Sequence, residues 1–285
     1  MKITEQVHLI RKEFYVTPEV KRYVNIYLIT GKYCYLIDSG VAGSEALIQA
    51  YLESINRKMS EIKAIFLTHA HPDHAGAAAE IKRQTGCKLY APSEETAWVE
   101  DIQKQFRERP IPNFFTLLSE SAEVDEMLTD GNGIELEDRI RIRAISTRGH
   151  SHGSMSYILN DRFVFTGDAI PVKNDLPIFV DFSETIKSLD KIYALPGIQY
   201  YCPAWDAVYT REKFEGVLAD SKAMLIKLKH AVLQVEQNTP DISDTDKITA
   251  VLKKADMLQF AGNPLVAKSI DAVKCFLSNH LKSDY

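Results

Sequence analysis

Cysteine is scarce in this sequence, and the four cysteines are scattered. Cys34, Cys87, Cys202 and Cys275 have no C-x-x-C spacing, which excludes the paired-cysteine patterns of zinc ribbons and disulfide-rich domains. Cys34 and Cys87 lie in or beside apolar segments, and such surroundings favour reduced thiols that pack as small apolar side chains.

Long apolar runs are also lacking. The first fourteen residues mix charged side chains among single apolar ones, so this segment has neither the apolar region of a signal peptide nor a spanning helix. We therefore expect a cytoplasmic protein that does not enter a membrane.

An excess of positive charge is missing as well. The formal net charge is −5 and the isoelectric point is about 5.9, which gives no basic surface to attract nucleic acid. No internal repeat is visible. The 285 residues are 45% hydrophobic, which is enough for one large domain or one domain with an appendage. We expect a small-molecule substrate, and a homo-oligomer is left open.

What the sequence does contain is a dense group of metal-ligand residues after a buried strand. Residues 64–67 form a continuous apolar run, and the next seven residues hold three of the eight histidines together with Asp73. Pro72 is expected to end regular structure, and 75–84 to form a helix that Gly86 stops. The polar group then occupies a strand-to-helix turn, where open α/β sheets place their ligand sites.

The spacing of these side chains suits metal binding. His69 and His71 are two residues apart, so on extended backbone they point to the same side and can share one ion. Asp73 and His74 follow the proline and face elsewhere, towards a second ion about 3.5–4 Å from the first. This H-x-H-x-D-H motif closely resembles that of the metallo-β-lactamase superfamily.

Two later motifs follow in the order typical of that superfamily. They are Gly149-His150 and Thr166-Gly167-Asp168, each at the end of a predicted strand. The resemblance implies that His150 completes the first metal site, and that Asp168 bridges it to a second site with Asp73 and His74. His152 has no counterpart among the usual ligands, so we expect it to be solvated or to support a ligand.

The last motif departs from the family pattern. Many relatives end a final strand in a turn such as P-G-H, whose histidine completes the second site, whereas Trp205 stands at that place here. An indole nitrogen only donates hydrogen bonds and cannot bind a metal. Asp206 could supply an oxygen or cap the helix expected near Thr210. The resemblance therefore implies Zn²⁺ as cofactor, with one or two ions per chain, and iron as an alternative.

The fold implied by the resemblance is α/β, a four-layer αββα sandwich over residues 1–209 followed by a C-terminal helical domain over 210–285. Strand patterns agree with it. Segments 23–29 and 33–37 predict a hairpin. In 140–145, apolar residues alternate with arginines, which predicts an antiparallel strand with one solvated face.

Several helix ends are also predicted. Ser44 is expected as an N-cap, and Ser93 is expected to open a helix towards Phe106. Asp181-x-x-Glu184 should open another helix, and Asn263 should cap the last one.

The segment between 107 and 133 is harder to interpret. It contains an apolar group near Phe114 that could form a flap favouring a lipophilic acyl group. The same group could instead pack in the core or form an oligomer contact, and we favour this second interpretation over the flap. Arg148, Lys173, Tyr201 and Trp205 are candidates for the wall of the substrate pocket.

The resemblance implies a metal-dependent hydrolase. A zinc-activated water would attack a thioester, ester or lactone, the substrate class suggested by relatives such as the hydroxyacylglutathione hydrolases. Asp73 would orient that water or take its proton. The alternative is a mononuclear iron oxidoreductase similar to persulfide dioxygenases. A phosphodiesterase or ribonuclease and a non-catalytic degenerate member are less favoured.

Overall fold

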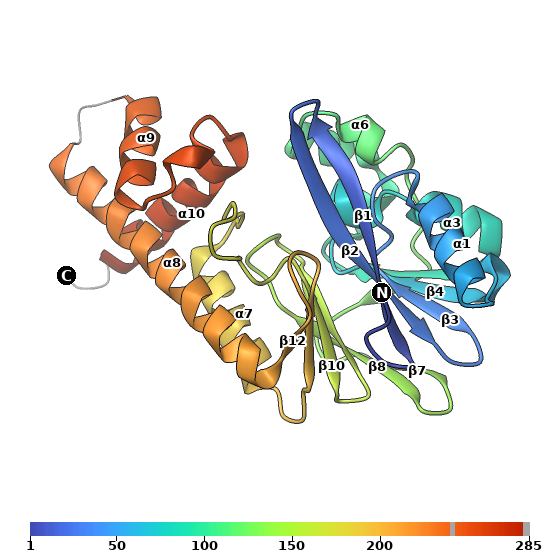
Figure 1. Cartoon of the computed structure of the whole chain (residues 1–285). Helices are drawn as coiled ribbons and strands as arrows, with labels where there is room; N and C mark the ends of the chain where they lie inside the picture. Colours follow the sequence, from blue (N-terminus) through green and yellow to red (C-terminus); the bar gives the residue numbers. More distant parts are fainter. Residues whose placement is uncertain (240–242, 282–285) are drawn as a thin grey trace.

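Two six-stranded mixed sheets pack face to face, and helices cover their outer faces (Figure 1). The computed structural model describes residues 1–239 and 243–281. The order of layers is helices, sheet, sheet and helices, which confirms the predicted αββα sandwich. A C-terminal helical region is added on one side.

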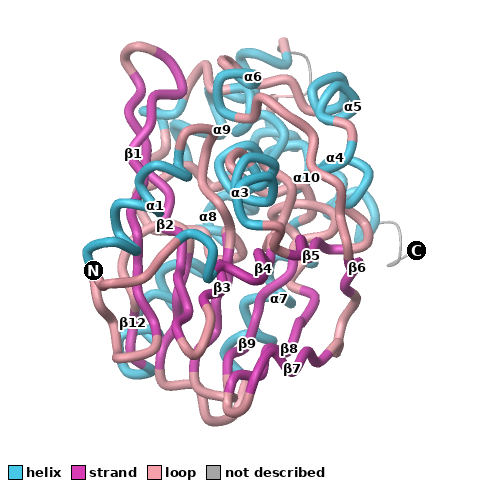
Figure 2. The backbone as a smooth tube through the Cα atoms, turned by 90° about the vertical axis from the view of Figure 1, so that its right-hand side faces the viewer, coloured by secondary structure: helices cyan, strands magenta, loops and turns pink. Residues whose placement is uncertain are grey.

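The first sheet has the strand order β1-β2-β3-β4-β5-β6. Its first three strands pair antiparallel, and β3 to β6 run parallel. The predicted hairpin is thus confirmed as β2 and β3. The strands are β1 (Val7–Thr17), β2 (Val20–Thr30), β3 (Cys34–Ile37), β4 (Ile62–Phe66), β5 (Lys88–Pro92) and β6 (Glu126–Leu128). The β1–β2 hairpin extends beyond the other strands (Figures 1 and 2).

The second sheet has the order β12-β11-β10-β9-β8-β7, and only β10 and β11 pair parallel. Its strands are β7 (Gly133–Glu137), β8 (Ile140–Ser146), β9 (Met155–Leu159), β10 (Phe163–Gly167), β11 (Tyr200–Pro203) and β12 (Tyr209–Thr210). In β8, Ile140 and Ile142 face the inner core while Arg141 is exposed. The predicted antiparallel strand with one solvated face is confirmed.

Short helices cover the first sheet. They are α1 (Ser44–Ser54), the 3-10 helix η1 (Met59–Glu61), α2 (Pro72–Ala75), α3 (Ala78–Thr85), α4 (Thr96–Glu100), α5 (Ile102–Glu108) and α6 (Phe114–Leu117). Ile48 and Ile81 of these helices pack in one core with Ile65 of β4. Ala64 and Phe66 face the other sheet, so β4 is buried on both faces, as its apolar run predicts.

The second sheet is covered by α7 (Phe182–Ala194) and by the first of the C-terminal helices, on which the other C-terminal helices pack. The C-terminal helices are α8 (Arg211–Asn238), α9 (Asp244–Lys254), the 3-10 helix η2 (Leu258–Phe260) and α10 (Pro264–Leu281). Val164 of β10, Leu189 of α7 and Phe214 of α8 belong to one apolar core. The C-terminal helices therefore extend the core of the sandwich, and the domain boundary at residue 209 stays a prediction.

Several helix ends differ from expectation. Pro72 starts α2 instead of ending regular structure, because proline fits the first turn, where its missing N–H is not needed. The helix expected over 75–84 is divided between α2 and α3, although Gly86 ends it in the left-handed conformation, as predicted. Ser44 is the first helical residue after Gly43, not the cap.

The helix expected from Ser93 to Phe106 is two helices, because Asp101 interrupts it and caps α5. The other two expected caps are confirmed. Asp181 accepts a hydrogen bond from the Glu184 N–H, and Asn263 accepts one from the Leu265 N–H at the start of α10. Among the described residues, the structure has no helix long and apolar enough to cross a bilayer.

Candidate metal centre

Three loops from both sheets meet at one end of the sandwich and carry the predicted ligands. The first follows β4 and holds the H-x-H-x-D-H motif, the second joins β8 to β9 and holds His150, and the third follows β10 and holds Asp168. A hydrogen bond of 2.9 Å from the Met155 N–H to the Thr68 carbonyl joins the sheets beside these loops. The site is therefore built across the two sheets.

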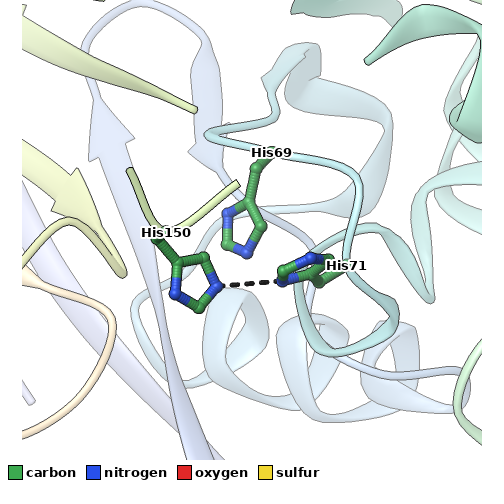
Figure 3. A group of neighbouring side chains, drawn as sticks. All are labelled: His69, His71 and His150. Carbon is green, nitrogen blue, oxygen red and sulfur yellow. Dashed lines mark hydrogen bonds between the residues drawn. The ribbon is translucent and has the colours of Figure 1, made fainter. Parts of the chain in front are cut away.

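Three imidazoles converge in what we call the first cluster, His69, His71 and His150 (Figure 3). One ring nitrogen from each lies within 4.8 Å of the others. His71 Nδ1 and His150 Nε2 are 2.9 Å apart. His150 Nδ1 donates to the Ile178 carbonyl at 2.9 Å, so its Nε2 keeps a lone pair that points into the cluster.

Asp73, His74 and Asp168 form a second cluster beside the first, and His69 is shared with it, since one ligand atom each of His69, His74 and Asp168 lies within 4.8 Å of the others. His74 Nε2 lies 3.2 Å from Asp168 Oδ1 and 3.7 Å from Asp73 Oδ2. Asp168 Oδ2 lies 3.3 Å from His150 Nε2. Asp168 thus lies close to a histidine of each cluster, and its role as a bridge between two ions stays a prediction.

Asp38 is a supporting residue that sequence reasoning missed. Its buried carboxylate accepts hydrogen bonds from the Thr68 N–H at 2.7 Å and from His74 Nδ1 at 2.8 Å. This fixes the His74 tautomer and leaves Nε2 facing the site. The sequence places Asp38 directly after a buried strand next to β4, and that position is the signal that could have identified it.

Burial and charge set the protonation of the imidazoles. Burial, together with neighbouring cationic groups, lowers the pKa of His69 and of His71 well below the usual value, and burial also lowers the pKa of His150. Burial acts in the same direction on His74, but three surrounding carboxylates outweigh it and raise its pKa. The first cluster is therefore neutral at pH 7, which is the protonation state in which an imidazole nitrogen can bind a metal.

Glu95 connects the two histidine loops and was also missed. One carboxylate oxygen accepts from the Ala70 N–H at 2.7 Å, and the other accepts from the Gly153 N–H at 3.0 Å and from the Ser151 hydroxyl. Gln105 donates to the Ala70 carbonyl at 2.7 Å. The peptide between His69 and His71 is thus held from both sides by buried side chains.

Gly149 fixes how His150 enters the site. Its φ of +127° suits glycine, and a Cβ there would collide with Thr185. Its carbonyl accepts a hydrogen bond of 2.7 Å from the Val180 N–H. The loop before His150 is therefore packed tightly against the start of α7.

Trp205 lines the cavity beside Asp168, as its predicted role in the wall requires. The Arg22 guanidinium lies 4.7 Å from the centre of its ring. The Asp206 carboxylate accepts a hydrogen bond from the Tyr209 hydroxyl and is in neither cluster, so its role as a substitute ligand stays a prediction. It does not cap α8, whose N-cap is Thr210.

The remaining histidines are placed elsewhere. His8 bonds Tyr51, His230 is exposed on α8, and the side chain of His280 lies outside the described residues. His152 is exposed at the rim of a small cavity next to the first cluster, in agreement with the solvated role.

Three of the four expected wall residues are wrong. Arg148 pairs with Glu94 on the surface, and Lys173 pairs with Asp220 beside a different cavity. Tyr201 is buried against Phe214 at a ring distance of 3.9 Å. These side chains lie close to the site motifs in sequence, but the fold turns them away from the metal ligands.

The actual walls come from segments remote from the motifs. A cavity of about 560 Å³, here the large cavity, is lined by the β1–β2 hairpin, by residues between 109 and 117 and by residues 259–265. A smaller one of about 220 Å³, the small cavity, is also lined by His71 and His150. Phe114 and Leu118 pack in the core, as favoured, while Leu117 also reaches the large cavity.

The donor set fits a divalent cation. His69 Nε2 is buried and has no hydrogen-bond partner within the described ranges, while His74 Nε2 and Asp168 Oδ1 are buried 3.2 Å from each other without hydrogen-bond geometry. Such unpaired buried atoms are costly unless an ion binds them. Three neutral imidazoles next to carboxylates are the ligands that zinc and iron prefer. The second cluster is the poorer of the two because no histidine reaches it from the turn at 203–206.

Comparisons with known proteins agree with this geometry. Residues 20–197 match the family model described as "Metallo-beta-lactamase superfamily". A hydroxyacylglutathione hydrolase of Rhodopseudomonas palustris is 25% identical over 85% of this chain and 88% of its own length. A probable metallo-hydrolase of Bacillus subtilis is 29% identical over 50% of this chain and 64% of its own length.

Solved structures confirm the fold. A metallo-beta-lactamase family protein from Thermus thermophilus superposes with a TM-score of 0.74 at 16% identity, covering 98% of this chain and 95% of that chain. A beta-lactamase domain protein from Burkholderia ambifaria gives a TM-score of 0.71 at 15% identity, over 98% and 88% of the two chains.

Proposed function

Because the chain belongs to the metallo-β-lactamase superfamily, we propose that it is a metal-dependent hydrolase acting on a thioester, ester or lactone. One observation carries the proposal: two clusters of buried ligand atoms, several of them unpaired, lie at the inner end of a large, mostly apolar cavity. Zn²⁺ is the proposed cofactor.

The first cluster, together with Asp168, would hold the ion. When bound, a divalent cation polarises a carbonyl oxygen and lowers the pKa of water towards neutrality. Asp38 and the Ile178 carbonyl keep His74 and His150 in the tautomers that present lone pairs to the site. Glu95 keeps the two loops in register, so the chain's own contacts orient the donors.

Asp73 is the proposed proton acceptor. It lines the large cavity, and burial raises the pKa of its carboxyl above the usual value. A carboxylate with a raised pKa is a better base, so Asp73 suits a role in orienting the attacking water and accepting its proton. The same acid then returns the proton to the leaving group.

The cavity supports an acyl substrate. Phe14, Val16, Val20 and Leu117 line it within one connected space that ends at His71 and His150. This lining suits the carbon chain of an ester or thioester, and the ligand cluster lies where the carbonyl carbon would be attacked. Relatives named hydroxyacylglutathione hydrolase, at about 25% identity, support the thioester within this class.

A substrate panel tests the proposal. Zinc-loaded protein should hydrolyse at least one member of a set of thioesters, esters and lactones, and Asp168→Ala should lose about a thousandfold or more of kcat/KM. Asp190→Ala is the matched control, because Asp190 is an exposed carboxylate on α7 that pairs with Lys222. Absence of turnover by the metal-loaded wild type, or equal rates for Asp168→Ala and wild type, would refute it.

Metal content separates this hydrolase from the predicted alternative. Mass spectrometry of protein purified without added metal should find zinc. One iron per chain, with oxygen consumption in the presence of a thiol persulfide, would instead support the mononuclear iron oxidoreductase.

A further inference from the structure

Arg109 is a buried cation without a partner. The residue is 8% exposed, and no hydrogen bond or ion pair joins its guanidinium to any residue in the described part of the chain. The guanidinium is reached only through the cavities that it lines, and a mostly buried charge without a partner costs free energy. A guanidinium kept in this state therefore indicates a ligand that completes it.

The guanidinium lies beside the clusters. Arg109 lines both the large and the small cavity, together with His71 and His150. The nearest carboxylates, those of Asp73, Glu95 and Asp168, raise its pKa against the larger effect of burial. None of the three is available to pair with Arg109: two belong to the second cluster, and both oxygens of Glu95 already accept hydrogen bonds.

A second cation faces the same space. Lys268 of α10 lines the small cavity next to Arg109 and has no ion pair within the residues described. Glu108 also lines this cavity, but its carboxylate accepts from the Trp98 indole at 2.6 Å and from Lys104. The small cavity thus presents two cationic groups and no free carboxylate from these lining residues.

Arg22 shows what a paired arginine looks like in the same site. It lines the large cavity, but its guanidinium bonds Asp175 at 2.8 Å and stacks over Trp205. Its charge is therefore balanced within the protein. Of these two arginines near the clusters, Arg109 is therefore the one whose charge can bind an anion.

We propose that Arg109, assisted by Lys268, binds a carboxylate or phosphate group of the substrate in the small cavity, while the scissile acyl group lies at the histidines. The planar fork of a guanidinium matches either oxyanion with two parallel hydrogen bonds. The substrate is then an acidic thioester or ester with its negative group on one side of the scissile bond. This inference rests on the proposed hydrolase function and narrows its substrate class.

Matched substrates test the inference. We would compare S-acetyl-3-mercaptopropionate with its carboxamide, and S-acetyl-2-mercaptoethyl phosphate with S-acetyl-2-mercaptoethanol, so that the two pairs separate carboxylate from phosphate. Wild type should prefer the charged member of at least one pair by about tenfold to a hundredfold in kcat/KM, mainly through KM. Arg109→Gln should abolish this preference, and Arg109→Lys should keep part of it.

The controls separate binding from folding. Arg143→Gln is matched, because Arg143 lies on the outer face of β8 and pairs with Asp161, and it should keep the full preference. Metal content and melting temperature are measured for each variant. Equal rates for charged and neutral substrates in wild type, or a preference that survives in Arg109→Gln, would overturn the inference while the hydrolase stands.

If no substrate is hydrolysed, the proposed function fails, and calorimetry then tests the anion site by measuring ligand binding directly. The metal-loaded wild type and Arg109→Gln are titrated with 3-phenylpropionate and its amide. Tighter binding of the carboxylate that depends on Arg109 still supports the anion site, and equal affinities overturn it.

Discussion

Replacing Glu95 by glutamine should weaken both folding and metal binding, because one carboxylate holds the two histidine loops. Glu95 is 3% exposed and accepts from Ala70, Gly153 and Ser151. The amide oxygen of glutamine can still accept from one side, but its NH₂ group then faces an N–H donor on the other. The Ser151 hydroxyl can rotate and accept, whereas a backbone N–H cannot.

The expected cost follows from these contacts. One buried N–H loses its acceptor, which costs about 1–3 kcal/mol, and the remaining bonds lose the strength that a charged acceptor gives them. We expect the free energy of unfolding of the metal-free chain to fall by about 2–4 kcal/mol. Because the ligand loops lose their alignment, zinc affinity should fall by about tenfold to a hundredfold.

Glu94→Gln is the matched control, since the neighbouring Glu94 is half-exposed and pairs only with Arg148 on the surface. It should change stability by about 0.5 kcal/mol or less. Urea denaturation gives the stabilities, and competition with a chromophoric chelator gives the zinc affinities. If Glu95→Gln matches Glu94→Gln in both measurements, Glu95 does not hold the loops together.

Three further predictions concern the rest of the molecule. Phe214 is buried and stacked on Tyr201, so Phe214→Ala should lower the free energy of unfolding, measured by urea denaturation, by about 3–5 kcal/mol. A decrease below about 1 kcal/mol would show that α8 is not held by this core. In the metal-free protein, the lowered histidine pKa values of the first cluster mean that the unfolded chain binds more protons below about pH 6.5. Stability should therefore fall from pH 7 to pH 5, against opposite contributions from the raised pKa values of His74 and Asp73, and a rise would contradict the assignment. A thiol reagent at pH 8 should label only the exposed Cys275 of the four cysteines in the native protein, because the other three are buried. Burial also raises the pKa of Cys34 to about 11. Rapid labelling of a second thiol would be inconsistent with this core.

The parts predicted well from sequence are those set by local patterns. The apolar run before His69 and the hairpin of β2 and β3 follow from side-chain periodicity and turn residues. The ligand candidates follow from their spacing, and the structure brings them together because each ends a strand at the same edge. Whether they bind metal stays a prediction.

The parts missed depend on contacts between distant segments. Glu95 follows β5 and appears in the sequence only as an acidic residue at a helix start, yet its bonds reach back to Ala70 and forward to Gly153. Arg109 lies in a proline-rich stretch without periodicity, and its importance comes from lacking a partner, which no sequence pattern reports. Arg148 and Tyr201 failed as wall residues because proximity in sequence to a motif does not set the direction of a side chain.

The division of the ligands between the sheets ties metal binding to the folding of the whole sandwich. The loop after β4 belongs to the first sheet, while His150 and Asp168 belong to the second, so an ion held by all of them is a cross-link between halves of the chain that are far apart in sequence. By thermodynamic linkage, free metal at about a hundred times its dissociation constant adds about 2.7 kcal/mol to stability. Removing such an ion would then lower the stability of both sheets together and not of one loop alone.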